Sequence, residues 1–200
     1  MEDAKSCCTS TACCGSTGCC RPQRAPARRK HVAIEFLYLD LETCTRCQGT
    51  ETVLAEALAD VGQVLDSAGY DLELTKTLVD SEEQATALRF VTSPTIRVNS
   101  QDIQMDAKES ACDPCFDISG TPTGCRVWVY DGVEYDVPPK AQIIAGVMRE
   151  VFSPAGRPNK EETDDFELPE NLRRFFAHRN AGDCCSGADK NPGGTGGRCC

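Results

Sequence analysis

The sequence predicts one α/β domain over residues 32–152, with cysteine-rich segments before and after it. Two observations support this fold class. Within the domain, short apolar runs rich in β-branched residues alternate with segments whose apolar residues recur at helical spacing, which is typical of a sheet covered by helices. Outside it, residues 1–20 and the end of the chain are rich in Gly, Ser, Thr and Cys, and we expect these tails to be disordered.

The first part of the domain predicts a β-α-β unit. The run HVAIEFLYLD at 31–40 is apolar and β-branched, which indicates a buried strand. A helix is expected over 49–69, and a second strand over 70–79, in which Leu72 and Leu74 alternate with polar residues. Because the connection is a helical crossover, the two strands should be parallel neighbours.

The second part of the domain predicts a helix over 80–90, a strand and turn over 93–103, a hairpin over 125–138 and a helix over 139–152. The hairpin carries an Asp-Gly pair at 131–132, the strongest short signal for a tight hairpin turn. The whole order is therefore β-α-β-α-β-β-β-α, which indicates a small α/β sandwich.

Residues 153–200 are expected to form a linker, a short amphipathic helix and a second cysteine-rich tail. The helix begins near Pro169 and places four apolar side chains on one face: Leu168, Leu172, Phe175 and Phe176. Exposing two adjacent Phe side chains would be costly, so we expect this helix to dock on the main domain.

The charge and hydropathy of the chain exclude some classes of function. The net charge of −10 argues against non-specific nucleic-acid binding, and the one basic stretch, at 21–31, is interpreted as a solvated linker between the tail 1–20 and the domain. No apolar run approaches the roughly 20 residues that span a bilayer, and the first residues lack the apolar core of a signal peptide. We therefore expect a cytoplasmic monomer without a membrane partner, in which the 15 cysteines serve metal binding or redox chemistry.

Cys44 and Cys47 form a Cys-x-x-Cys motif in the stretch YLDLETCTRCQGT, between the first strand and the first helix. A helix N-terminus offers unpaired N–H groups and a positive dipole end. Both favour the thiolate, which is the form that attacks disulfides or binds soft metals. Arg46 adds a positive charge, whereas Asp40 and Glu42 act in the opposite direction.

This arrangement resembles the thioredoxin and glutaredoxin superfamily in the position of the Cys-x-x-Cys motif and in the segment TSPTI at 92–96. In that superfamily a cis-proline at this place lies against the dithiol, and Pro94 resembles it. The resemblance covers about residues 32–152 and implies a thioredoxin-like sandwich with a mixed central sheet and flanking helices. It also implies catalytic roles for Cys44 as the exposed nucleophile, Cys47 as the resolving thiol and Pro94 beside them.

A second cluster, formed by Cys112, Cys115 and Cys125, lies in an insertion over 104–125 that the resemblance does not explain. Three thiolates suit a thiophilic ion. As(III) prefers three sulfurs, whereas tetrahedral zinc needs a further ligand, from Asp113 or a cysteine elsewhere. A disulfide between Cys125 and one of the other two is an equally open interpretation. We expect the insertion to pack beside the first dithiol and to give a region of five cysteines.

The tails carry paired cysteines that resemble metallothionein-like sequences and the vicinal pairs of arsenic metallochaperones. Adjacent cysteines rarely bond to each other, but they present two sulfurs to one soft ion. We expect them to collect ions and pass them to the ordered domain, where effective concentration favours transfer, although a tail without a role is the alternative. The predicted tail ligands are Cys7, Cys8, Cys13, Cys14, Cys19, Cys20, Cys184, Cys185, Cys199 and Cys200.

These features favour a thioredoxin-like protein that binds or transfers As(III), Hg(II), Zn(II) or Cu(I) in resistance or homeostasis. No cofactor other than such a metal or metalloid ion is indicated. One alternative is a thiol-disulfide oxidoreductase that acts through Cys44 and Cys47 on a partner protein. Another is a metal- or metalloid-detoxifying enzyme. His31 and His178 are expected at the surface and Trp128 in hairpin packing, so none of them is a candidate ligand.

Overall fold

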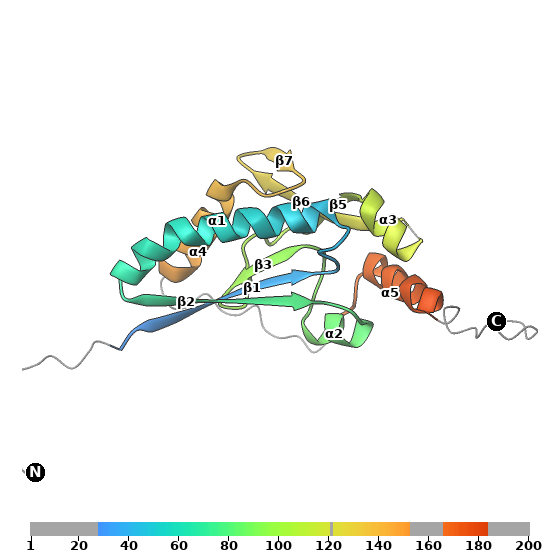
Figure 1. Ribbon diagram of the computed structural model, residues 1–200, viewed down its shortest axis with the longest axis horizontal. Helices are drawn as coiled ribbons and strands as arrows, with labels where there is room; N and C mark the ends of the chain where they lie inside the picture. Colours follow the sequence, from blue (N-terminus) through green and yellow to red (C-terminus); the bar gives the residue numbers. More distant parts are fainter. Residues whose placement is uncertain (1–27, 121, 153–165, 184–200) are drawn as a thin grey trace, which may run out of the picture.

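The computed structural model describes residues 28–120, 122–152 and 166–183, and Figure 1 shows how its elements are arranged. The elements are β1 (Lys30–Tyr38), α1 (Thr45–Ser67), β2 (Tyr70–Leu78), α2 (Glu82–Ala87), β3 (Thr95–Val98), β4 (Gln101–Asp102), β5 (Lys108–Ala111), α3 (Asp113–Ser119), β6 (Gly124–Tyr130), β7 (Val133–Tyr135), α4 (Lys140–Phe152) and α5 (Glu170–Asp183). The predicted α/β fold class is confirmed in this coarse form.

The central sheet has four strands in the order β2-β1-β3-β4. β1 pairs with β2 in parallel, as the helical crossover predicts, and with β3 in antiparallel orientation. The sheet is therefore mixed. β2 is an edge strand, so Leu74 and Leu78 remain 37% and 41% exposed although they alternate as an inward face would.

Alternating side chains of β1 face two separate apolar cores. Val32, Ile34 and Phe36 pack with α1 and α4, which together cover one face of the sheet (Figure 1). Near the end of β1 and beyond it, Leu37 and Leu39 face the other core, where α2 and α5 pack. The chain therefore leaves the sheet anchored on both sides, just before it reaches Cys44.

The predicted hairpin is present, but it does not extend the central sheet. β6 and β7 pair around Asp131 and Gly132, whose φ angles of 51° and 78° are both positive, as a tight type I′ turn requires. β5 joins them in a separate three-stranded antiparallel sheet. A hydrogen bond of 2.7 Å from the Arg126 N–H to the Ser93 carbonyl connects this second sheet to the loop before β3.

The predicted docking of the last helix is also confirmed. Leu172, Phe175 and Phe176 of α5 are fully buried, and Leu168 just before it is 7% exposed. These side chains pack on Leu37, Leu39, Val79, Ala85 and Phe90.

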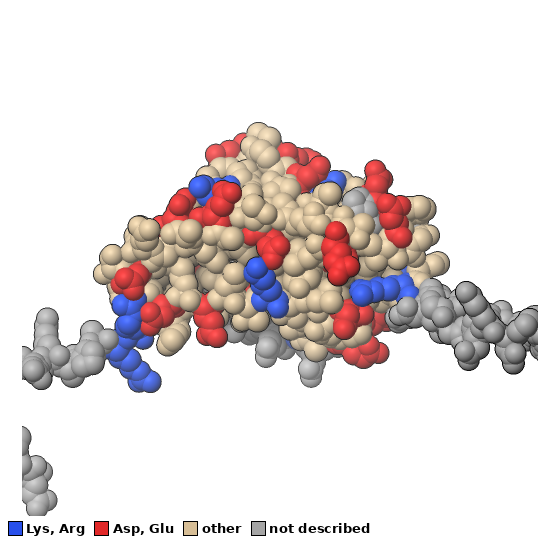
Figure 2. Space-filling view, in the orientation of Figure 1, with Lys and Arg blue, Asp and Glu red and all other residues tan. Residues whose placement is uncertain are grey.

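Acidic side chains are spread over the face of the molecule seen in Figure 2, with isolated basic side chains between them. This distribution fits the net charge of −10. In the described ranges, no helix combines the length and the apolar character that crossing a membrane requires.

Candidate metal centre

The first dithiol lies where the sequence places it, at the start of α1. Cys44 is the N-cap residue and Cys47 follows in the first turn. The loop before them is fixed by its own hydrogen bonds, because Asp40 Oδ1 accepts the N–H groups of Thr43 at 2.5 Å and of Cys44 at 3.0 Å. From α1, the Gln48 amide donates to two carbonyls of the same loop, at 3.0 and 2.8 Å. The backbone of Cys44 is therefore held before any ligand arrives.

The insertion folds into a structure that sequence reasoning did not resolve. β5 leads into the short helix α3, which begins directly after Cys112 and has a proline in its first turn. Cys115 lies in that turn, and Cys125 follows on β6. The second Cys-x-x-Cys motif thus repeats the local arrangement of the first, with one cysteine as N-cap and the other one turn later.

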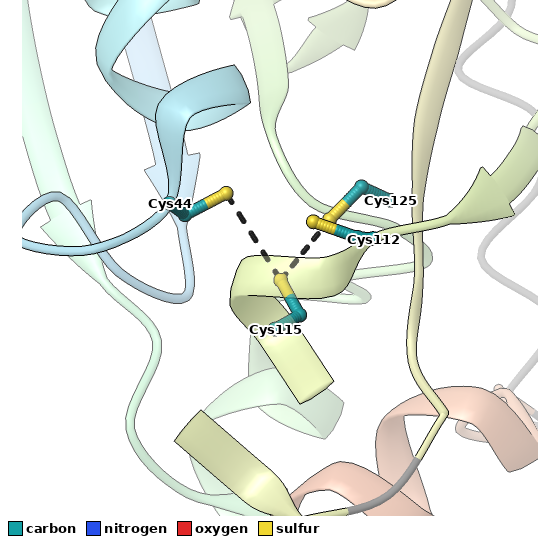
Figure 3. Close-up of side chains that lie close together, drawn as sticks. All are labelled: Cys44, Cys112, Cys115 and Cys125. Carbon is teal, nitrogen blue, oxygen red and sulfur yellow. Dashed lines mark hydrogen bonds between the residues drawn. The ribbon is translucent and has the colours of Figure 1, made fainter. Parts of the chain in front are cut away.

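Four sulfurs converge in the space between these elements (Figure 3). Cys115 Sγ lies 3.1 Å from Cys125 Sγ and 4.0 Å from Cys44 Sγ. All four sulfurs, those of Cys44, Cys112, Cys115 and Cys125, lie within 4.8 Å of one another. The predicted meeting of the two motifs is confirmed. The fourth sulfur that a tetrahedral site needs comes from Cys44, and Asp113, the other candidate for that place, is not in the group.

Cys47 belongs to the same buried cluster but not to the group of four. Its sulfur lies 3.5 Å from Ser93 Oγ, and that oxygen also accepts the N–H of Leu39 at 3.1 Å. The peptide bond between Ser93 and Pro94 is cis, as the resemblance predicted. The two cysteines of the first motif therefore have different neighbours: Cys44 faces the insertion, and Cys47 faces the loop before β3.

The prediction that Cys44 is exposed is wrong. Its exposed fraction is 0%, like those of Cys47, Cys115 and Cys125, and Cys112 is only 4% exposed. The physical reason is the insertion, whose three cysteines pack against Cys44 and Cys47 in one buried cluster. Among the described residues the five cysteines are free thiols, so the structure contains no disulfide staple across the insertion.

The thiols influence one another's ionisation because they lie so close. Hydrogen bonds from Cys112, then from Cys115 and Cys125, hold the pKa of Cys44 below its ordinary value. Cys115, followed by Cys125, lowers the pKa of Cys112 in the same way. The pKa of Cys47 is raised, first by its hydrogen bond to Cys44 and then by burial. The two N-cap cysteines are therefore the sulfurs that give up protons first.

The pKa values of Cys115 and Cys125 are raised, in both cases first by the hydrogen bond to Cys112. Protons are therefore held less firmly on Cys44 and Cys112 than on Cys115 and Cys125. A soft cation would replace these protons, because thiolates are its preferred ligands and metal binding releases protons.

Arg46, between the two cysteines of the first motif, connects them to the insertion. Its guanidinium donates to Ser110 Oγ at 2.8 Å and to the Ala111 carbonyl at 3.3 Å, and it pairs with Asp136 at 2.7 Å. A longer contact of 3.5 Å reaches the carbonyl of Cys125. Arg46 therefore places positive charge near the backbone of Cys125 and ties the start of α1 to β5, a bridging role that the sequence alone did not reveal.

The remaining residues that the sequence singled out lie outside the group of four sulfurs or outside the described residues. Pro94 is buried, His31 and His178 are exposed, and Trp128 is fully buried in the main core. The ten tail cysteines, from Cys7 to Cys20 and from Cys184 to Cys200, lie outside the described residues.

The comparisons with known proteins give one match. A family model described as "Domain of unknown function (DUF2703)" matches residues 32–146, which is more than half of the 200 residues. Searches of curated proteins and of solved structures gave no significant match. The matched segment contains β1 except its first two residues, all of β2 to β7, all five described cysteines and about half of α4, whereas α5 lies beyond it. The chain therefore belongs to the DUF2703 family.

Proposed function

We propose that this protein binds one thiophilic metal ion through Cys44, Cys112, Cys115 and Cys125. The observation that carries the proposal is the convergence of four buried sulfurs within 4.8 Å of one another. A zinc ion with Zn–S bonds of about 2.3 Å at tetrahedral angles has sulfurs roughly 3.8 Å apart. The Sγ–Sγ separations of 3.1 and 4.0 Å lie on either side of that value, so small side-chain rotations would complete the site.

The number and burial of the sulfurs favour Zn(II) over the other candidate ions. As(III) prefers three sulfurs and would leave one thiol unused, whereas a closed set of four thiolates is typical of tetrahedral zinc. All four sulfurs lie too close together to surround more than one metal ion. The positive N-terminal end of the long helix α1 and the guanidinium of Arg46 offset part of the negative charge that four thiolates bring.

The scaffold of this site is proposed to be thioredoxin-like. The parallel pair β1-β2, the Cys-x-x-Cys motif at the start of α1 and the cis bond before Pro94 support this assignment. The paired cysteines of the tails are proposed to capture ions and pass them to the four-thiol site by ligand exchange.

Native mass spectrometry tests the ion-binding proposal. The protein is the full-length chain with its ten tail cysteines replaced by serine, kept reduced and offered Zn(II), As(III), Hg(II) or Cu(I) separately. We expect one Zn(II) per chain, loss of binding in Cys44→Ser, and retention in the matched variant Cys47→Ser, whose sulfur lies outside the group of four. If the five-cysteine protein takes up none of these ions, the proposal is wrong.

A second candidate function is thiol-disulfide exchange through Cys44 and Cys47. It is favoured by the contact between the two thiols and by the lowered pKa of Cys44, which its hydrogen bonds to the other cysteines produce. The burial of Cys44 opposes reaction with a protein disulfide. Catalytic reduction of a small disulfide that is lost in Cys44→Ser and Cys47→Ser alike would favour this function over ion binding, which does not use Cys47.

A further inference from the structure

The last helix, α5, contacts both chain segments that supply the thiols, although it lies beyond the family-matched residues. Figure 1 shows α5 beside α3. Its polar contact is made by Asn171, whose Oδ1 accepts the N–H of Gly124 at 3.0 Å. The Asn171 Nδ2 donates to the carbonyl of Gly124 at 3.2 Å and to Glu109 Oε1 at 2.9 Å. Gly124 directly precedes Cys125, so one side chain holds both polar groups of the residue next to a candidate ligand.

The apolar contact of α5 reaches the other half of the site. Phe175 and Phe176 pack in the same buried core as Leu37 and Leu39, which stand at the end of β1 and lead to Cys44. Ile118 of α3 packs against this core as well. The helix therefore lies against the segment that carries Cys44 and against the segment that carries the other three sulfurs.

We propose that α5 is part of the metal centre and that Asn171 is a positioning residue for it. The inference rests on the proposed ion binding. By holding Gly124, Asn171 fixes the backbone at the start of β6. The side chain of Cys125 therefore projects toward Cys44 before an ion is present. Arg46 ties α1 to β5 independently, so the two halves of the site are joined twice: by the polar contacts of Arg46, and by α5, which holds the insertion through Asn171 and the end of β1 through its apolar side chains.

Loss of Asn171 should weaken the site without removing any ligand. Truncation leaves the N–H and carbonyl of Gly124 without these partners, and partners outside the ligand set typically change metal affinity by about 10- to 100-fold. Because Asn171 acts on the backbone next to a ligand and not on a sulfur, we expect the lower end, about a tenfold loss of affinity.

The experiment uses Co(II) as a spectroscopic probe for the tetrahedral site, with the reduced full-length chain that carries serine at the ten tail positions. Three quantities are measured: the dissociation constant by competition with a chelator, the rate at which a chelator removes Co(II), and the thiolate-to-cobalt absorption. We expect Asn171→Ala to bind Co(II) about tenfold more weakly, to release it faster and to show an altered spectrum. The matched control is Arg174→Ala, on the same helix, where the side chain pairs with the exposed Glu170.

A charge exchange separates positioning from general stability. Asn171→Asp places a carboxylate against Glu109 and should bind Co(II) more weakly than Asn171→Ala. Adding Glu109→Gln to this variant gives the new carboxylate an amide donor and should restore tighter binding and the original spectrum. A role only in overall stability would not produce this recovery of the spectrum.

The outcomes distinguish the two proposals. If the parent protein binds no Co(II) and none of the other ions, the proposed function fails. If the parent binds Co(II) and Asn171→Ala matches it in affinity, release rate and spectrum, the inference about α5 is overturned. Should Asn171→Ala not fold, Glu109→Ala removes one of the three hydrogen bonds, and release about threefold faster is expected; unchanged release would then overturn the inference.

Discussion

The buried ion pair between Arg126 and Asp102 gives a sharp prediction for stability next to the thiol cluster. The Arg126 side chain is fully buried, and its guanidinium contacts Asp102 at 2.6 and 3.1 Å, with further bonds to the carbonyl of Gln104 and to Thr95 Oγ1. Asp102→Ala leaves this cation without its counter-charge, which costs about 3–5 kcal/mol of unfolding free energy for a buried pair. Because Asp102 is 16% exposed and two other acceptors remain, we expect the lower value, about 3 kcal/mol.

Urea unfolding of the reduced, ion-free protein measures this effect. With a slope of about 2 kcal/mol per molar urea, a loss of 3 kcal/mol lowers the midpoint by about 1.5 M. The double variant Arg126→Met with Asp102→Ala removes both charges and should recover most of the loss. Lys140→Ala breaks an exposed pair with Asp60 and should leave the midpoint unchanged. If Asp102→Ala behaves like Lys140→Ala, the reasoning about burial is refuted.

Three further predictions concern packing and ion binding. A methyl group added at Gly146 would lie 2.8 Å from Ile103 Cβ, so Gly146→Ala should lower the free energy of unfolding in urea by about 1–3 kcal/mol. Adding Ile103→Ala should reduce that cost. Equal urea midpoints for Gly146→Ala and the parent would contradict this packing. Phe176→Ala removes a fully buried ring of α5 and should lower the free energy of unfolding by about 3–5 kcal/mol. It should also make the arginines of α5 accessible to trypsin. Unchanged cleavage would argue against tight docking of α5. Zn(II) at about one hundred times its dissociation constant should add about 2.7 kcal/mol to the stability, seen as a higher thermal midpoint. The same addition should have no effect on Cys44→Ser, and an equal rise there would place the ion elsewhere.

Local sequence signals predicted most of the fold. The Asp-Gly pair fixed the hairpin turn, the helical crossover fixed the parallel pairing of β1 with β2, and the two adjacent Phe residues indicated a docked final helix. Each of these features depends on residues close together in the sequence. The second sheet was not foreseen, because the partner of β6 is the short strand β5, whose residues KESA carry no apolar alternation.

The site was predicted in outline, but its ligand set was not. The two motifs were expected to meet, and the distance of 4.0 Å between Cys44 and Cys115 confirms it. Spacing alone places Cys44 and Cys47 one helical turn apart and does not tell which one faces the insertion. That choice depends on the path of residues 104–125 over the start of α1, which is set by long-range contacts such as those of Arg46 and Asn171.

The separate neighbourhoods of Cys44 and Cys47 have a consequence for how the protein responds to oxidants. Once the sulfur of Cys44 has formed a disulfide with Cys47, it can no longer bind an ion as a thiolate. The proposed ion and a Cys44–Cys47 disulfide therefore exclude each other. An occupied centre would therefore shield the first motif from oxidation, and an oxidised motif would leave only the three sulfurs of the insertion. The amount of free ion and the redox state of the surroundings would then compete for one atom, Cys44 Sγ.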